Sequence, residues 1–266
     1  MNEKLSRPQF NQMDTTEKQT LMESLAARYN MTFLDLHTFD RWGQSSTTGI
    51  FEKDGRKFVF VPGDTVTLGW EQFAVGLNQE SREELEYLFR EWEMERDPEE
   101  MIRESMAPVR QAAIGPMLVG RELEKINWEP VKMDDPRLTV HPDWLKEFRD
   151  FAWSDSSSLT LHQSARIERT EKGFQICIYN HTDYDALLAM LENRGFSLPT
   201  ADEWAYLCGG GCRTLFPWGD GLDYSMRLRW FEDMDEDENR PYDMEEPNFF
   251  GLSIAYDPYM REVVQA

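Results

Sequence analysis

The chain has 266 residues, of which 40% are hydrophobic and 13% aromatic, enough apolar material for a substantial folded core. Fifty acidic against 28 basic residues give a formal net charge of −22, which repels phosphate and excludes most nucleic-acid-binding functions. No apolar run approaches the length of a membrane span, and the first ten residues contain no apolar signal region. We therefore expect a soluble, cytoplasmic protein that is not bound to a membrane.

The first fifty residues predict an N-terminal extension with one helix. Residues 1–12 have the composition of a loose tail. Asp14 and Glu17 form a capping-box pattern for a helix that ends near Tyr29, and residues 31–36 predict a short strand. The polar run at residues 45–49 is typical of a loop.

A hairpin is predicted at residues 57–70, where two apolar strands flank Pro62-Gly63. Residues 78–107 then predict an acidic insertion of two helices, one beginning at the capping pattern of Ser81 and the other at Asp97-Pro98. The first of these helices carries one apolar stripe, formed by Leu85, Leu88, Phe89 and Trp92. This stripe must dock on the same domain or on a partner.

Further along the chain, the pattern predicts a short helix at residues 141–148 and a hairpin at residues 164–179. Thr182 is expected to cap a helix that ends at Gly195. Thr200 and Glu203 form a complete capping box for a helix that is ended by the glycines at residues 209–211. This last motif is interpreted as a strand-to-helix corner, and so as a structural rather than a catalytic device.

Three short motifs carry a family resemblance. Residues 198–204 read LPTADEW, residues 217–219 read PWG, and residues 248–252 read NFFGL. In this order they resemble the formylglycine-generating enzymes, also called sulfatase-modifying factors, and the sequence VPGDTVTLG at residues 61–69 resembles the first conserved piece of that family. The resemblance implies an α+β domain related to the C-type lectin fold over residues 51–266, preceded by the extension of residues 1–50. It leads us to expect Trp204 and Trp218 in one buried core.

The resemblance also implies a chemistry, the conversion of a sulfatase cysteine to formylglycine by oxygen and a Cu(I) ion held by two thiolates. In the family that thiolate pair lies toward the C-terminus, and this chain stops at Ala266, before the matching segment. Cys208 and Cys212 follow the LPTADEW motif instead, and the third cysteine is Cys177. The histidines do not form the iron-site pattern of the family's ergothioneine-pathway relatives, since they are scattered: His37, His141, His162 and His181.

These departures predict a non-catalytic binding or regulatory protein, a pseudoenzyme whose ligand is an unknown protein or small molecule. The alternative is an oxidase-type enzyme of the sulfatase-modifying class with a displaced or partner-supplied active site. An incomplete family fold would also leave open sheet edges, which a second subunit or the extension could cover.

A candidate cation site lies between the second and third motifs. Five residues occupy positions 1, 3, 5, 9 and 12 of a calcium-loop pattern: Asp235, Asp237, Asn239, Asp243 and Glu246. Position 6 is Arg240, where a calcium loop needs glycine. The pattern makes this segment a candidate calcium site, with a solvated acidic loop as the favoured interpretation. The cofactor of the protein is unknown, and calcium is the one candidate that the sequence offers.

Overall fold

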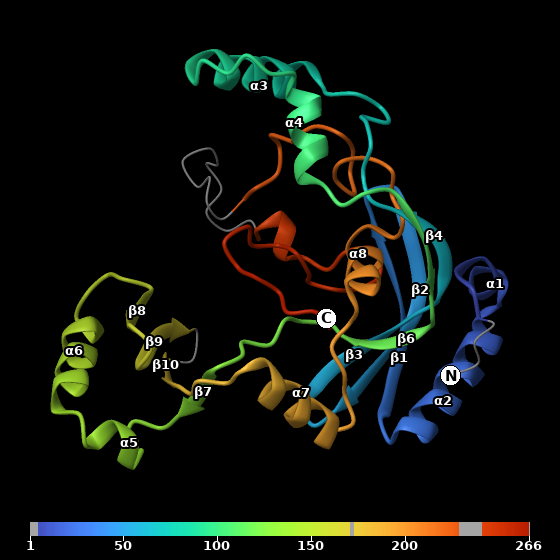
Figure 1. Cartoon of the computed structure of the whole chain (residues 1–266). Coiled ribbons are helices and arrows are strands. Elements are labelled where there is room, and N and C mark those ends of the chain that lie inside the picture. Colours follow the sequence, from blue (N-terminus) through green and yellow to red (C-terminus); the bar gives the residue numbers. More distant parts are fainter. Residues whose placement is uncertain (1–4, 171–172, 229–240, 266) are drawn as a thin grey trace. The chain divides into compact units, whose positions relative to one another are not determined.

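The structure is a computed structural model that describes residues 5–170, 173–228 and 241–265. It is an α+β protein whose strand pairs are antiparallel (Figure 1). The chain divides into two compact units. The larger unit is made of Met1–Leu123 and Leu198–Ala266, and the inserted unit is Glu124–Ser197.

A four-stranded sheet in the order β1-β2-β3-β6 forms the centre of the larger unit. Its strands are β1 (Thr32–Arg41), β2 (Gln44–Lys53), β3 (Arg56–Val61) and β6 (Met117–Gly120). Two-residue turns with positive φ at both positions connect the first three strands, at Trp42-Gly43 (53° and 71°) and Asp54-Gly55 (52° and 73°). Such turns match the right-handed twist of the strands that they join, which explains why this meander is so regular.

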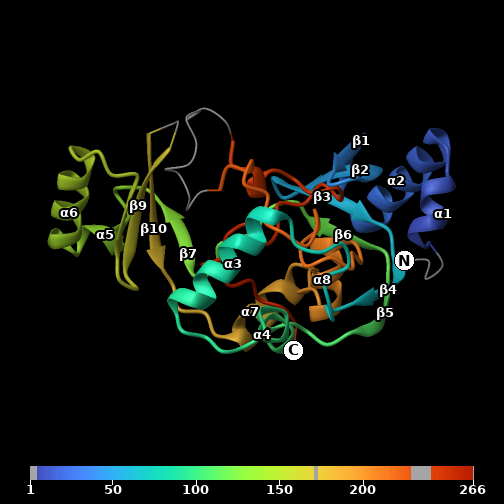
Figure 2. The same ribbon diagram turned by 90° about the horizontal axis from the view of Figure 1, so that it is seen from above.

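Helices lie on both sides of this sheet (Figures 1 and 2). α1 (Arg7–Gln12) and α2 (Thr15–Tyr29) cover one side, and α2 packs on β1 and β2. The fully buried Phe10 of α1 lies with its ring 5.1 Å from that of Phe60. On the other side, α8 (Ala201–Gly209) packs against the two-stranded ladder of β4 (Asp64–Leu68) and β5 (Arg110–Ile114).

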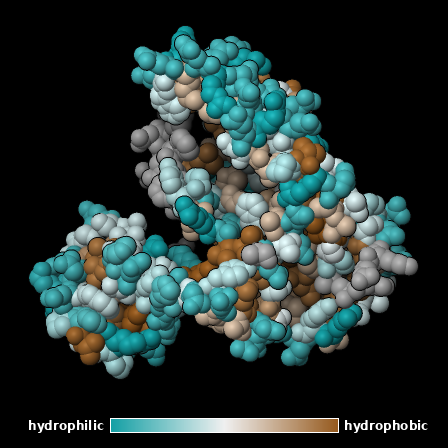
Figure 3. Space-filling view, in the orientation of Figure 1, coloured by the Kyte–Doolittle hydropathy of each residue, from teal (hydrophilic) through white to brown (hydrophobic). Residues whose placement is uncertain are grey.

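An arm of two helices connects β4 to β5 within the larger unit. It consists of α3 (Gln79–Glu91) and α4 (Pro98–Ser105) and corresponds to the predicted acidic insertion. α3 buries only Ser81 and Phe89, and α4 buries no residue. The surface over α3 is predominantly hydrophilic (Figure 3).

The core of the larger unit lies between the sheet and α8, where the last segment of the chain also contributes. Its buried members are Phe39, Ile50, Val59, Val61, Leu68, Ala112, Ile114, Tyr206, Leu207, Phe249, Phe250 and Leu252. Burial of this much apolar surface, at about 25 cal/mol per Å², is the main stabilising contribution to the unit.

The inserted unit has a sheet and a core of its own. Its strands follow the order β7-β10-β9-β8, and its helices are short. The elements are β7 (Trp128–Val131), α5 (Pro136–Thr139), α6 (Pro142–Ala152), β8 (Ser158–Leu161), β9 (Ala165–Thr170), β10 (Gly173–Tyr179) and α7 (Tyr184–Asn193). The core is formed by Leu138, Phe148, Phe151, Ala165, Ile167, Ile176 and Ile178.

Several local predictions are confirmed. Both capping boxes are present, with Glu17 N donating to Asp14 Oδ1 at 2.8 Å and Glu203 N to Thr200 Oγ1 at 3.2 Å. Asp97 caps α4, and the hairpin of β9 and β10 forms as expected.

Other local predictions are wrong. Residues 45–49 lie in β2 rather than in a loop, and residues 1–12 contain α1 in place of a loose tail. Residues 57–70 do not pair as a hairpin, because β3 pairs with β2 and β6 whereas β4 pairs with β5. The caps of two helices are also displaced: Asn78 caps α3 and Asp183 caps α7, in place of Ser81 and Thr182.

Candidate functional site

The third motif meets α8, the helix that the first motif begins, through the buried side chain of Asn248. Its Nδ2 donates to the carbonyl of Leu207 in α8 at 2.8 Å, and its Oδ1 accepts the amides of Phe250 at 2.9 Å and Leu252 at 3.2 Å. The ring of Phe250 lies 5.2 Å from that of Tyr206, whose hydroxyl donates to the carbonyl of Pro62 at 3.0 Å. The side chain of Asn248 therefore connects the NFFGL segment to α8 through hydrogen bonds to main-chain groups.

The second motif contributes to a stack of aromatic rings. Trp218 lies parallel to Phe216 at a centroid distance of 4.8 Å and at 5.3 Å from Trp42, the residue at the tip of the β1–β2 turn. The guanidinium of Arg41 covers the ring of Trp42 at 4.5 Å. The indole Nε1 of Trp218 donates to the carbonyl of Gly221 at 3.0 Å. Neighbouring rings and one cation thus cover one another, a packing arrangement that stabilises the turn.

The expectation that Trp204 and Trp218 share one buried core is wrong, because both side chains are only half-buried. Trp204 lies on the first turns of α8, and its Nε1 donates to Glu262 Oε2 at 2.6 Å. The other oxygen of the same carboxylate accepts the amide of Ala255 at 2.8 Å. Trp204 therefore anchors the C-terminal segment, while the neighbouring Tyr206 and Leu207 fill the core.

Asp220, the residue that follows the PWG motif, is a buried carboxylate that accepts hydrogen bonds from main-chain amides. Its Oδ2 accepts from Val75 at 2.5 Å and Gly76 at 2.8 Å, and its Oδ1 accepts from Leu215 at 2.9 Å. Burial raises the pKa of this carboxyl, but the amides, including that of Ala74, outweigh burial and leave the pKa below its ordinary value. The carboxylate is therefore held ionised by amide dipoles.

The cysteines of the chain lie in surroundings that disfavour thiolates. All three are free, and Cys177 lies in the inserted unit. Burial raises the pKa of Cys208, with a further contribution from Glu262, and burial also raises the pKa of Cys212. Because metal binding and nucleophilic attack both need the thiolate, Cys208 and Cys212 are poorly suited to either role.

Most of the candidate calcium residues, Asp235, Asp237 and Asn239, lie outside the described residues. Of the two that are described, Asp243 accepts the amide of Arg227 at 2.7 Å through its carboxylate. The guanidinium of Arg41 donates to the carbonyls of Asp243 and of Glu246, the latter at 2.8 Å. A fixed positive charge therefore lies against this part of the pattern. Within residues 5–170, 173–228 and 241–265, no group of three or more acidic, histidine or cysteine side chains is placed to hold a metal ion.

The arm borders a shallow groove of about 420 Å³ on the larger unit. The groove is lined by Glu80, Glu83 and Glu84 from α3 and by Tyr224. Three carboxylates and a phenol make this lining negative, which favours contact with positively charged groups. The predicted apolar stripe lies elsewhere on α3: Phe89 is buried, but Trp92 is 61% exposed.

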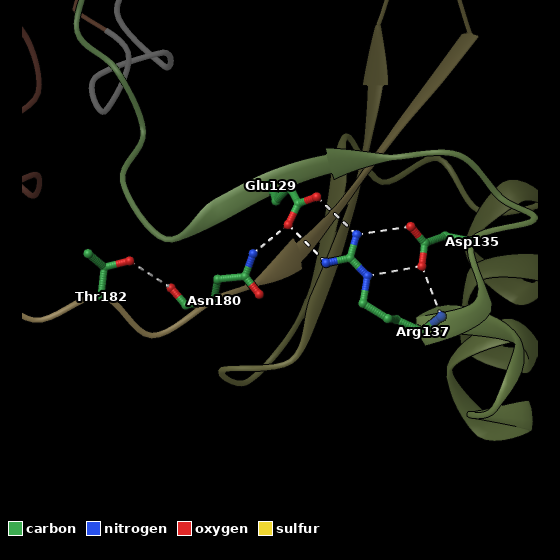
Figure 4. Close-up of polar contacts among 5 residues, drawn as sticks. All are labelled: Glu129, Asp135, Arg137, Asn180 and Thr182. Atoms are coloured by element: carbon green, nitrogen blue, oxygen red, sulfur yellow. Dashed lines mark hydrogen bonds and ion pairs between the residues drawn. The ribbon is translucent and has the colours of Figure 1, made fainter. Parts of the chain in front are cut away.

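The inserted unit holds one conspicuous polar network (Figure 4). Arg137 donates to both oxygens of Glu129 at 2.9 Å each and to Asp135, and Asn180 donates to Glu129 at 2.6 Å. These bonds lower the pKa of Glu129 and Asp135 and raise that of Arg137. The network ties β7, α5 and the segment after β10 together, with the one guanidinium of Arg137 bonded to two carboxylates.

Comparisons with protein-family models, with curated proteins and with solved structures give no match. No helix in the described part of the chain combines the length and the apolar composition needed to cross a membrane.

Sequence reasoning did not identify Asn248, Asp220 and Arg41 as the side chains that join distant segments. The partners that connect them to distant segments are main-chain groups, and no local spacing indicates those partners. The Pro-Trp-Gly-Asp turn was a usable signal for Asp220, since aspartate beside glycine in a turn commonly accepts main-chain amides.

Proposed function

We propose that this chain is a non-catalytic binding or regulatory protein built on a scaffold like that of the sulfatase-modifying factors. One observation carries the proposal. Within the described residues, the polar side chains of the three motifs bond to the main chain, to one another or, for Asp202 and Trp204, to the side chains of Arg110 and Glu262. Thr200 and Glu203 cap α8, and Asn248 connects the NFFGL segment to α8 by hydrogen bonds. Asp220, beside the second motif, accepts hydrogen bonds from main-chain amides. Groups used in this way are not available to a substrate.

The thiols support the same proposal. A copper-dependent oxidase of this class needs two accessible thiolates that converge on one ion. Burial raises the pKa of both Cys208 and Cys212, which opposes formation of that ligand pair. We further propose that the protein works in a reducing compartment, the cytoplasm, since its three cysteines are free.

The second candidate is the oxidase-type enzyme with a displaced or partner-supplied site. It is favoured by one observation, the position of Cys208 and Cys212 four residues apart at the end of α8, close enough for Cys212 to affect the pKa of Cys208. In this candidate the two sulfurs rearrange to bind copper.

An assay for the aldehyde product separates the two candidates. The protein is incubated with Cu(I), oxygen and a peptide that carries the sulfatase cysteine motif, and the peptide is analysed by mass spectrometry. We expect the peptide cysteine to remain unmodified. Turnover to formylglycine that disappears in Cys208→Ser and Cys212→Ser, and persists in the control Cys177→Ser, would establish the enzyme instead.

A further inference from the structure

The arm that carries α3 and α4 leaves the end of β4 and returns to the start of β5, and these two strand ends pair with each other. Leu68 pairs with Arg110 at the end of the β4–β5 ladder, and the amide of Trp70 donates to the carbonyl of Ala107 at 3.2 Å. Gly69, with φ of +86°, lies so close to Pro108 that a Cβ would be 2.3 Å from its carbonyl oxygen. The base of the arm is therefore closed by its own contacts, and displacement of the arm does not require β4 and β5 to separate.

Beyond this base, the hydrogen bonds that the structure describes between the arm and the rest of the larger unit go to the turn at residues 215–222. Asp220 accepts the amides of Val75 and Gly76. It is 2% exposed, and no ion pair to it occurs among the residues that the structure describes. Main-chain amides, rather than a cation, compensate this charge. Hydrogen bonds to a charged acceptor contribute more than neutral ones, and a buried group that loses its partners is strongly destabilising.

A second clasp lies directly beside the first. Asn78 caps α3 with its oxygen and donates its Nδ2 to the carbonyl of Leu222 at 2.8 Å. In return, the amide of Leu222 donates to Ser81 Oγ at 2.8 Å. Gly221 permits this approach, since a Cβ there would be 2.8 Å from Asn78 Nδ2. Both clasps connect residues 75–81 to residues 215–222.

The rest of the arm contributes little packing. α4 buries no residue, and α3 buries only Ser81, which belongs to the clasp, and Phe89. Trp92 and Tyr87 are 61% and 54% exposed. Segments with few buried apolar contacts open at a lower free energy than the core of the same unit.

We propose that Asp220 is a latch that holds residues 71–107 against the turn at residues 215–222, and that neutralising this one carboxylate lowers the free energy of opening the arm as a unit while the sheet stays paired. In the closed form the apolar stripe of α3 is only partly covered, since Phe89 is 7% exposed and Trp92 is 61% exposed.

Hydrogen exchange of the full chain, followed by mass spectrometry at pH 7, tests the latch with Asp220→Asn. The substitution keeps the shape, but an amide offers one acceptor oxygen and turns its NH₂ toward main-chain donors. We expect peptides from residues 74–91 to exchange at least about tenfold faster than in the unsubstituted protein, because bonds to a charged acceptor are lost. Peptides from β1, β2 and β3 must still be protected when the arm has exchanged fully. The matched control is Asp223→Asn, an exposed aspartate of the same loop, which should change neither region.

Two results would overturn the proposal: an unchanged arm in Asp220→Asn, or loss of protection in arm and strands together. If Asp220→Asn does not fold, two measurements decide instead. In Asn78→Ala the arm should exchange faster while the strands stay protected. In the unsubstituted protein, the exchange rate of the arm should rise only weakly with urea at low concentrations, because opening the arm exposes little surface. The exchange rate of the strands should rise steeply. Equal dependence in both regions would contradict a separate arm.

Discussion

At the scale of single residues, the side chains that join distant segments of the larger unit act on the main chain. Asn248, Asp220 and Arg41 each bond to backbone groups far away in sequence, and each is largely removed from water. A polar group placed in this way stabilises the fold only while its partners are present, since an unsatisfied buried group is costly.

Replacement of Asn248 by alanine should therefore be severely destabilising. It removes the donor to Leu207 and the acceptor of two amides, all of them buried. We expect a loss of about 2–4 kcal/mol in the free energy of unfolding, from several unsatisfied groups at about 1–3 kcal/mol each. Urea unfolding measures this loss. Asn193→Ala, at an exposed position, serves as the control and should change stability by less than about 0.5 kcal/mol. A similar small change at Asn248 would show that the loop is not held by this side chain.

The lowered pKa of Asp220 predicts that the free energy of unfolding depends on pH. Its pKa in the folded chain is lowered, so its stabilising contribution is present above the unfolded value of about 3.9 and is lost as pH falls through the folded value. The unsubstituted protein should exceed Asp220→Asn in stability by about 1.5–3 kcal/mol at pH 6, the range for hydrogen bonds to a charged group. The difference should shrink below pH 4. Urea unfolding of both proteins at pH 6 and pH 3 measures this difference in the free energy of unfolding. The same difference at both pH values would contradict a stabilising role of the ionised Asp220 carboxylate.

At the scale of elements, the sequence identifies helices better than it identifies strand pairing. The capping boxes at Asp14 and Thr200 depend on residues three apart, so they are visible locally. β2 was missed because its polar residues are buried: Ser46 is 3% exposed, and Thr48, fully buried, donates to the carbonyl of Phe60 at 2.6 Å. The Asp54-Gly55 turn was the available signal for a hairpin at this place. Which strands pair across Pro62-Gly63 depends on the tertiary fold.

The N-terminal segment is an integral part of the larger unit at this scale. Phe10 and Met22 are fully buried, and β1 pairs with β2 from Gln44 to Glu52. Deletion of residues 1–45 uncovers one face of the sheet and leaves β2 with an open edge. We expect an aggregated or unfolded product, detected by size-exclusion chromatography and circular dichroism. A folded monomer with unchanged melting would show that the segment is dispensable.

At the scale of the whole molecule, the division into two units was not visible in the sequence. Residues 124–197 lack a flanking linker composition, so nothing marked them as separate. The candidate site was predicted in part: the three motifs were identified, but the roles of their side chains depend on contacts that only the fold brings together.

The inserted unit should fold by itself. Its sheet is complete within Glu124–Ser197, and Leu138, Phe148 and Ile167 are at most 1% exposed. The isolated segment should unfold cooperatively in urea, and Phe148→Ala should lower its stability by about 3–5 kcal/mol or abolish folding. Trp153→Ala is the control, since Trp153 is 92% exposed. A segment that shows no cooperative transition would contradict an independent core.

The central claim is that the cysteine pair of this chain is not a poised copper site, and thiol reactivity tests it most directly. The native protein is treated with iodoacetamide at pH 7, and the labelled positions are mapped by mass spectrometry over time. Because burial raises the pKa of Cys208 and Cys212, we predict that both react at least about tenfold more slowly than in the urea-unfolded chain. Labelling of both cysteines at the unfolded rate, suppressed by one equivalent of Cu(I), would contradict the account.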